Sequence, residues 1–144
     1  MATKNDGLTQ EEREAVKQRA KELREQAKAG KNREAGTKSV LDAIAALEGA
    51  DREIGEGLFA VVSDVAPDLV PKTYYGMPGF ANAEGKIVVF YQPAGKFKTR
   101  YGTIGFEDRA HLDDGDIWPV GFGVAAWTPA VREHVAAQVA KAVS

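Results

Sequence analysis

The chain has 144 residues, a formal net charge of −2 and no cysteine, a length that suits one core rather than separate cofactor and substrate domains. Hydrophobic residues make up 44 % of it, but no apolar run reaches the roughly 18 residues of a membrane span. The absence of cysteine excludes disulfides, thiol nucleophiles and thiolate metal sites, and the slight acidity argues against a dedicated nucleic-acid binder. The first residues do not resemble a signal peptide, so we expect a cytoplasmic protein.

Residues 1–36 differ in composition from the rest of the chain. They hold nine Lys and Arg and seven Asp and Glu, and the first aromatic residue of the chain is Phe59. Thr9 followed by Glu12 is typical of a capping box, which begins a helix that we expect to end near Gly30 and Gly36. We therefore predict a charged, partly flexible helical extension over 1–36 and an α+β domain over 37–144. A thin apolar stripe on this helix suits docking on the domain or on a partner helix, or simple solvation: Val16, Ala20, Leu23 and Ala27.

The later elements follow from hydrophobic periodicity. We expect one helix that is capped by Ser39 and a second that runs from Asp51 to Pro67. A region of strand character follows, and a last helix begins at Thr128 and Pro129. Asn82 to Gly85 is typical of a hairpin turn. Strands are expected over Ile87–Tyr91, Phe97–Tyr101, Thr103–Phe106 and Val120–Val124. This order predicts the α+β class, with a largely antiparallel sheet covered by helices on one face.

The residues that enzymes use for catalysis form no recognisable motif. Ser39 and Ser63 are expected inside helices, no Gly-x-Ser-x-Gly elbow or P-loop is present, and Gly121-Phe122-Gly123 lacks the third glycine of a dinucleotide fingerprint. We therefore expect a protein that binds without catalysing a reaction.

Two groups of carboxylates are candidates for weak metal binding. Asp113, Asp114 and Asp116 share a loop with a glycine, and oxygen ligands of this kind suit hard cations. Glu53 and Glu56 occupy an outward face of the Asp51 helix, where they could bind iron or another divalent ion weakly. In both cases the alternative is charge that keeps an exposed surface soluble.

A second candidate site would bind a small ligand or a peptide. If Phe97–Tyr101 is a strand, Lys96, Lys98 and Arg100 point to one side of it and could bind a phosphate or an acidic partner, or pair with Asp113, Asp114 and Asp116 within the protein. The ring-rich turn of Tyr74, Tyr75, Gly76, Met77 and Pro78, with Tyr101 and Trp118 elsewhere, could line a ligand pocket. Core packing is the alternative for these rings.

Several short phrases in order resemble the YdhG-like family of small bacterial domains of unknown function, over about Val40 to Ser144. They are Pro67-Asp68, Lys72, Tyr75-Gly76-Met77-Pro78, Lys96 with Arg100-Tyr101, Gly105-Phe106, Leu112-Asp113-Asp114-Gly115, Trp118-Pro119 and Ala142-Val143-Ser144. The resemblance implies a mostly antiparallel, curved sheet of about five strands with helices packed on one face.

One relative in that family is described as a frataxin-like iron chaperone. The resemblance therefore implies a cytoplasmic binding domain that delivers iron, with exposed carboxylates such as Glu53, Glu56, Asp113 and Asp114 as weak ligands. No required cofactor, nucleic acid or membrane partner is expected, and the chain is expected to be a monomer or a weak homodimer. The alternative function is a module that binds a small ligand, a peptide or a protein through the Tyr74–Gly79 turn and the Lys96, Lys98 and Arg100 strand.

Overall fold

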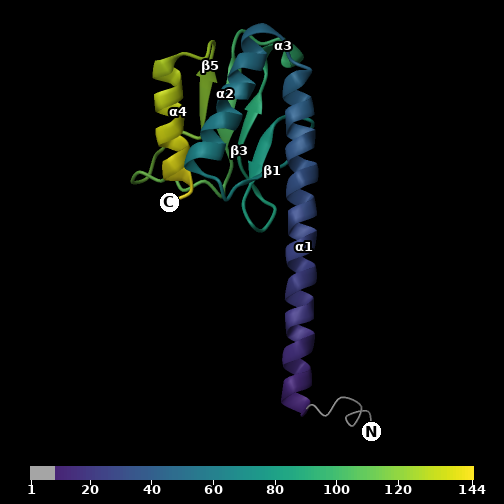
Figure 1. Ribbon diagram of the computed structural model, residues 1–144. Helices are drawn as coiled ribbons and strands as arrows, with labels where there is room; N and C mark the ends of the chain where they lie inside the picture. Colours follow the sequence, from purple (N-terminus) through teal and green to yellow (C-terminus); the bar gives the residue numbers. More distant parts are fainter. Residues whose placement is uncertain (1–8) are drawn as a thin grey trace. The chain divides into compact units, whose positions relative to one another are not determined.

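In the computed structural model the described residues are 9–144, without the side chains of Glu22 and residues 25–31. The chain divides into two compact units, Met1–Glu34 and Ala35–Ser144. Helix α1 spans Gln10–Ala45 (Figure 1). The capping box at its start is confirmed, because the backbone N–H of Thr9 donates to Oε1 of Glu12 at 2.8 Å and the backbone N–H of Glu12 donates to Oγ1 of Thr9 at 3.1 Å.

The expected end of this helix at Gly30 or Gly36 is wrong, and Ser39 is an interior residue of α1 rather than the cap of a separate helix. A contact outside the helix explains why position 36 of α1 is a glycine. A Cβ atom at this position would lie 2.0 Å from the carbonyl oxygen of Pro71, so the glycine permits close backbone approach. A glycine inside a helix costs about 1 kcal/mol relative to alanine, and packing rather than helix termination accounts for this one.

The sheet has five antiparallel strands in the order β1-β2-β3-β4-β5, so each strand pairs with its neighbour in sequence. This confirms the predicted α+β class with an antiparallel sheet. The strands are β1 (Val70–Pro71), β2 (Gly79–Ala81), β3 (Ile87–Gln92), β4 (Gly102–Phe106) and β5 (Gly121–Val124).

A β-bulge interrupts the pairing of β2 with β3. Phe80 pairs with Val89 while Ala81 pairs with Ile87, which leaves Val88 as the extra residue on β3. Side chains normally alternate between the faces of a strand, yet Val88 and Val89 are both buried. The bulge therefore directs one more valine toward the core than a regular strand would.

Helices cover one face of the sheet. Helices α2 (Gly49–Val65) and α4 (Pro129–Ala142) pack against each other and against the strands in Figure 1. The side chain of Thr128 caps α4, accepting from the backbone N–H of Val131 at 3.2 Å, as predicted. The helix residues of the core are Val40 and Ile44 of α1, Ile54, Leu58, Val61 and Val62 of α2, and Val135, Val139 and Ala142 of α4.

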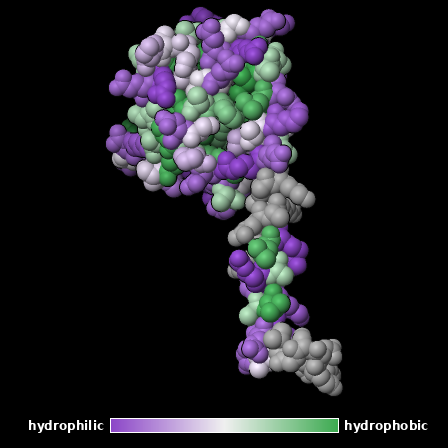
Figure 2. Space-filling view, in the orientation of Figure 1, coloured by the Kyte–Doolittle hydropathy of each residue, from purple (hydrophilic) through white to green (hydrophobic). Residues whose placement is uncertain are grey.

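The opposite face of the sheet carries aromatic rings over glycines. A Cβ at Gly105 would lie 2.4 Å from the ring of Phe90, and one at Gly123 would lie 3.0 Å from the ring of Tyr101. On the face of Ala35–Ser144 seen in Figure 2, hydrophobic surface shows between hydrophilic side chains. None of the helices formed by the described residues has both the length and the apolarity that crossing a membrane requires.

Tyr91 joins the sheet to two helices. This fully buried side chain of β3 donates its hydroxyl to the carbonyl oxygen of Asp51 at 3.0 Å. The carboxylate of Asp51 in turn accepts from the backbone N–H of Gly95, at 2.9 Å, in the short helix α3 (Ala94–Phe97). The start of α2, the centre of the sheet and α3 therefore share one network of hydrogen bonds.

Burial, with the nearby Asp51, raises the pKa of Tyr91 above its usual value near 10. Its contribution to stability is then complete below about pH 10 and is lost as pH rises toward the folded-state pKa, because the unfolded tyrosine ionises first. We expect the urea midpoint to fall above pH 10, with a smaller fall in Tyr91→Phe. An equally steep fall in the variant would contradict this assignment.

Gly57 of α2 lies against the indole ring of Trp127, which comes just before α4. A Cβ at Gly57 would lie 2.1 Å from the ring, so we expect Gly57→Ala to destabilise the fold by about 1–3 kcal/mol through overpacking. This outcome opposes the gain of about 1 kcal/mol that alanine normally brings to a helix. Urea denaturation measures the change, with Glu53→Ala on the exposed face of α2 as the control within about 0.5 kcal/mol of wild type.

Candidate functional site: a pocket between two helix ends and a hairpin

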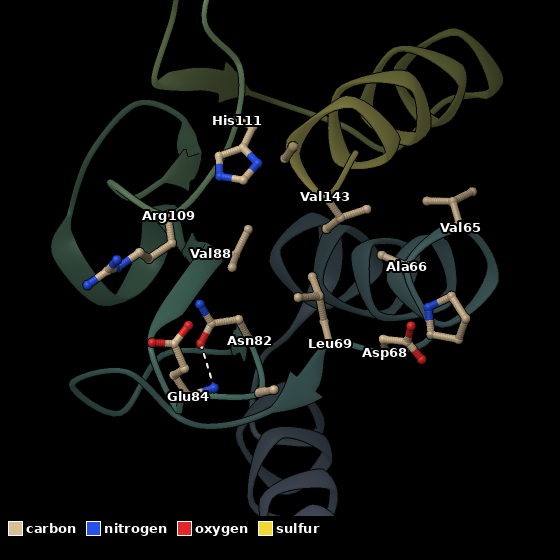
Figure 3. Close-up of a pocket in the computed structure, with 13 residues that line it drawn as sticks. Val65, Ala66, Asp68, Leu69, Asn82, Glu84, Val88, Arg109, His111 and Val143 are labelled. Carbon is tan, nitrogen blue, oxygen red and sulfur yellow. Dashed lines mark hydrogen bonds between the residues drawn. The ribbon is translucent and has the colours of Figure 1, made fainter.

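A pocket of about 430 Å³ lies where α2 and α4 end, beside the β2–β3 hairpin (Figure 3). The residues that line it are Val65, Ala66, Pro67, Asp68, Leu69, Asn82, Ala83, Glu84, Val88, Arg109, His111, Ala142 and Val143. Its volume falls in the range of small-molecule sites in proteins.

Local chain geometry forms the apolar floor. Pro67 stops α2, and the backbone N–H of Leu69 then donates to the carbonyl oxygen of Ala66 at 3.0 Å, in a turn that buries the Leu69 side chain. Val88, the extra residue of the β-bulge, adds a second buried side chain. In Figure 3 the side chains of Leu69, Val88 and Val143 border one common space.

Asn82 supplies one polar group at this space. Its side-chain oxygen accepts the backbone N–H groups of Glu84 and Lys86, each at 3.0 Å, which holds the hairpin turn. These two bonds assign the oxygen of the amide, so the NH₂ group of Asn82 is the part left to donate to a ligand. The expected turn over Asn82–Gly85 is confirmed.

His111 supplies a second polar group on the other side. Its backbone N–H donates to the carbonyl oxygen of Ala142 at 2.9 Å, and its ring Nδ1 lies 3.3 Å from the carbonyl oxygen of Ser144. The ring is thereby tied to the end of α4, and Nε2 is the ring nitrogen available to a ligand. In Figure 3 the guanidinium of Arg109 points away from the space that His111 and Asn82 border.

The pocket is therefore an apolar space with a donor at one side and an imidazole at the other. Sequence reasoning did not select Leu69, Asn82, Val88, His111 or Val143 as ligand-binding residues. The signals for the individual parts were present, namely the stop at Pro67 and the turn at Asn82. Their meeting at one place depends on the tertiary fold.

The ring-rich turn predicted to bind a ligand is a tight hairpin. Tyr74 and Met77 exchange two backbone hydrogen bonds of 2.8 and 2.9 Å, and Tyr75 and Gly76 have φ angles of 50° and 78°, as in a type I′ turn. Met77 is buried, whereas Tyr75 is 84 % exposed. A bulky residue with positive φ is uncommon, and this conformation holds the Tyr75 ring out from the sheet.

Tyr74 is engaged within the protein. Its hydroxyl donates to Oε2 of Glu107 at 2.7 Å, and its ring lies 5.2 Å from that of Phe90. The hydrogen bond to Glu107 raises the pKa of Tyr74. Of the rings in this turn, Tyr75 is therefore the one placed to meet a ligand.

The expected strand over Phe97–Tyr101 is wrong, so Lys96, Lys98 and Arg100 do not share a strand face. Lys96 is in α3, and Lys98 follows it with a left-handed φ of 56° and ψ of 41°. The alternation of charged and uncharged residues predicted a strand, but the carboxylate of Asp51 holds the backbone N–H of Gly95 and favours a helical turn.

The residues of that predicted site lie apart. Lys96 extends over Gly76, where an added Cβ would lie 3.1 Å from its Nζ, and both border a hollow of about 570 Å³. The guanidinium of Arg100 lies 5.0 Å from the ring centre of Tyr101. Trp118 lines a different cavity of about 260 Å³ together with Asp113. Among the described residues, no ion pair joins the three cations to the acidic loop.

The predicted metal ligands do not converge. Glu53 and Glu56 are exposed on α2, where Glu56 pairs with Arg52 at 3.3 Å, and Asp113, Asp114 and Asp116 are exposed in their loop. Within residues 9–144, apart from the undescribed side chains, no group of three or more His, Cys, Asp or Glu is placed to hold a metal ion. These residues do not fit an iron site as they stand, and the iron-chaperone hypothesis stays a prediction.

Comparisons of the chain with protein-family models, with curated proteins and with solved structures gave no match. Membership of the YdhG-like family therefore stays a prediction from the short phrases quoted above.

Lys98 offers a test of the corrected local structure. Because a left-handed conformation costs about 1–2 kcal/mol for a residue with a Cβ, we expect Lys98→Gly to stabilise the protein by about 1 kcal/mol. Lys96→Gly, within α3, is the matched control and is expected to destabilise by up to about 1 kcal/mol. Urea denaturation compares the two, and destabilisation by Lys98→Gly would contradict the left-handed assignment.

Proposed function

We propose that residues 35–144 form a non-enzymatic domain that binds a small, neutral and mostly apolar molecule in the pocket of Figure 3. The observation that carries this proposal is the pairing of an apolar floor with the NH₂ group of Asn82, whose oxygen is already used within the hairpin. A ligand carbonyl oxygen is the natural acceptor for this donor.

Charge around the pocket argues against an anionic ligand. The carbonyl ends of α2 and α4 carry the negative ends of their helix dipoles, and the carboxylates of Asp68 and Glu84 are among the lining residues. An anionic ligand would meet these groups, whereas the cation of Arg109 points away from the centre of the pocket.

Binding rather than catalysis is supported by the side chains present. All of the lining residues are described, and they include no hydroxyl, thiol or amine that His111 could activate as a nucleophile. A cytoplasmic location is part of the proposal, supported by a composition without cysteine.

Acetophenone, a neutral aromatic molecule with one carbonyl acceptor, is a suitable probe. We expect methyl and amide NMR shifts at Leu69, Val88, Val143 and Asn82, with a Kd on the order of 1 mM. Ethylbenzene, which lacks the carbonyl, is expected to bind several-fold more weakly. Shifts at the Tyr74–Gly79 turn instead would favour the alternative ligand site, and no shift at either place would refute the proposal.

Three variants make the test specific. Val143→Phe, at the edge of the pocket, is expected to weaken acetophenone binding about tenfold or more by filling the space, whereas Ile117→Phe at an 84 % exposed position is the control without effect. Asn82→Asp keeps the oxygen that holds the hairpin but removes the donor, so it should abolish the preference for acetophenone over ethylbenzene. A preserved preference would show that Asn82 does not contact the carbonyl.

A further inference from the structure

The N-terminal part of α1, within the unit Met1–Glu34, carries an apolar stripe on its surface. Val16 and Leu23 are 58 % and 49 % exposed, and Ala20 lies between them at spacings of four and three residues. Such spacing puts the three on one side of a helix, as at the d, a and d positions of a coiled coil. Figure 2 shows hydrophobic side chains among hydrophilic ones along this part of the helix. Ala27, which extends the pattern in sequence, has a side chain outside the described residues.

Positive side chains flank this stripe on both sides. With Val16 and Leu23 at d positions, the e positions hold Lys17 and Arg24 and the intervening g position holds Arg19. All three cations are at the surface. In a coiled coil, side chains at e and g face those of the partner helix and set which partner is accepted.

A second copy of this helix would place like charges opposite each other. In a parallel pair Arg19 would face Arg24 of the other copy, and in an antiparallel pair Lys17 and Arg24 would face each other, which is unfavourable in either case. A partner with carboxylates at e and g would instead face each cation with an opposite charge. The stripe also lacks the aromatic side chains that favour insertion into a membrane surface.

We propose that the face of α1 formed by Val16, Ala20 and Leu23 docks an acidic amphipathic helix of a partner protein, with Lys17, Arg19 and Arg24 selecting its charge. The described stripe covers less than two heptads, so the contact is weak and readily exchanged. This proposal concerns residues 9–34 and does not depend on the pocket in residues 35–144.

The test uses the full chain and a labelled 21-residue peptide with Leu at a and d and Glu at e and g, which repels itself. Fluorescence anisotropy is expected to show saturable binding that weakens several-fold between 50 and 300 mM NaCl, because exposed charge pairs are screened. Circular dichroism of each variant confirms that the helix is retained.

Variants distinguish binding through the side chains at e and g positions from a general effect of the net charge of the helix. Arg24→Glu and Leu23→Ala are each expected to weaken binding about fivefold or more. Lys21→Glu changes the charge equally but at a b position, outside the a, d, e and g positions that face a partner helix, and is expected to stay closer to wild type than Arg24→Glu. A peptide with Lys opposite position 24 should restore binding to Arg24→Glu.

Four results would overturn the proposal. They are no binding of the peptide at 1 mM, equal losses in Lys21→Glu and Arg24→Glu, sedimentation of the free chain as a dimer at about 100 µM, and tighter binding to phosphatidylglycerol vesicles than to the peptide. The last two would assign the stripe to a second copy or to a membrane surface.

Discussion

The buried hydroxyl of Tyr91 is the interaction on which the rest of the domain depends. It binds the carbonyl oxygen of Asp51 at the start of α2, while the carboxylate of the same residue holds the backbone of Gly95 in α3. A buried phenol without a partner is costly, so the position of α2 on the sheet is restricted to the one that satisfies this hydroxyl. With the start of α2 held here, the opposite end of the helix reaches the β2–β3 hairpin, where the candidate pocket forms.

That pocket arises from features that each have a structural explanation of their own. Pro67 must end α2, Asn82 must hold its turn, and the backbone of His111 must satisfy the carbonyl oxygen of Ala142 at the end of α4. None of these requires a ligand. The side-chain NH₂ group of Asn82 and one ring nitrogen of His111 then stay available beside apolar side chains. A few specific polar groups on an apolar surface are typical of small-molecule sites.

Elements with strong local signals could be predicted from the sequence. The stripe of α2, the central strand β3, the cap at Thr128 and the turn at Asn82 all depend on periodicity or local hydrogen bonds, and each lies where it was expected. Prediction failed where a distant contact decided the outcome. Gly36 lies inside α1 rather than at its end, where Pro71 leaves no room for a Cβ atom, and Lys96 is in a helical turn because Asp51 binds the backbone beside it. The pocket was missed for the same reason, since segments from 65 to 143 in the sequence meet there.

The β-bulge places Val88 in the lining of the pocket without changing how the other residues of β2 and β3 pair. A deletion of this residue alone would let Ile87 and Val89 pair with Ala81 and Phe80 as in a regular strand, while Val89 and Tyr91 kept their present register. The floor of the pocket would lose one valine, and the network around Tyr91 would keep its partners. A single residue at this point in β3 therefore adds apolar lining to the pocket while every other pairing of the sheet stays the same.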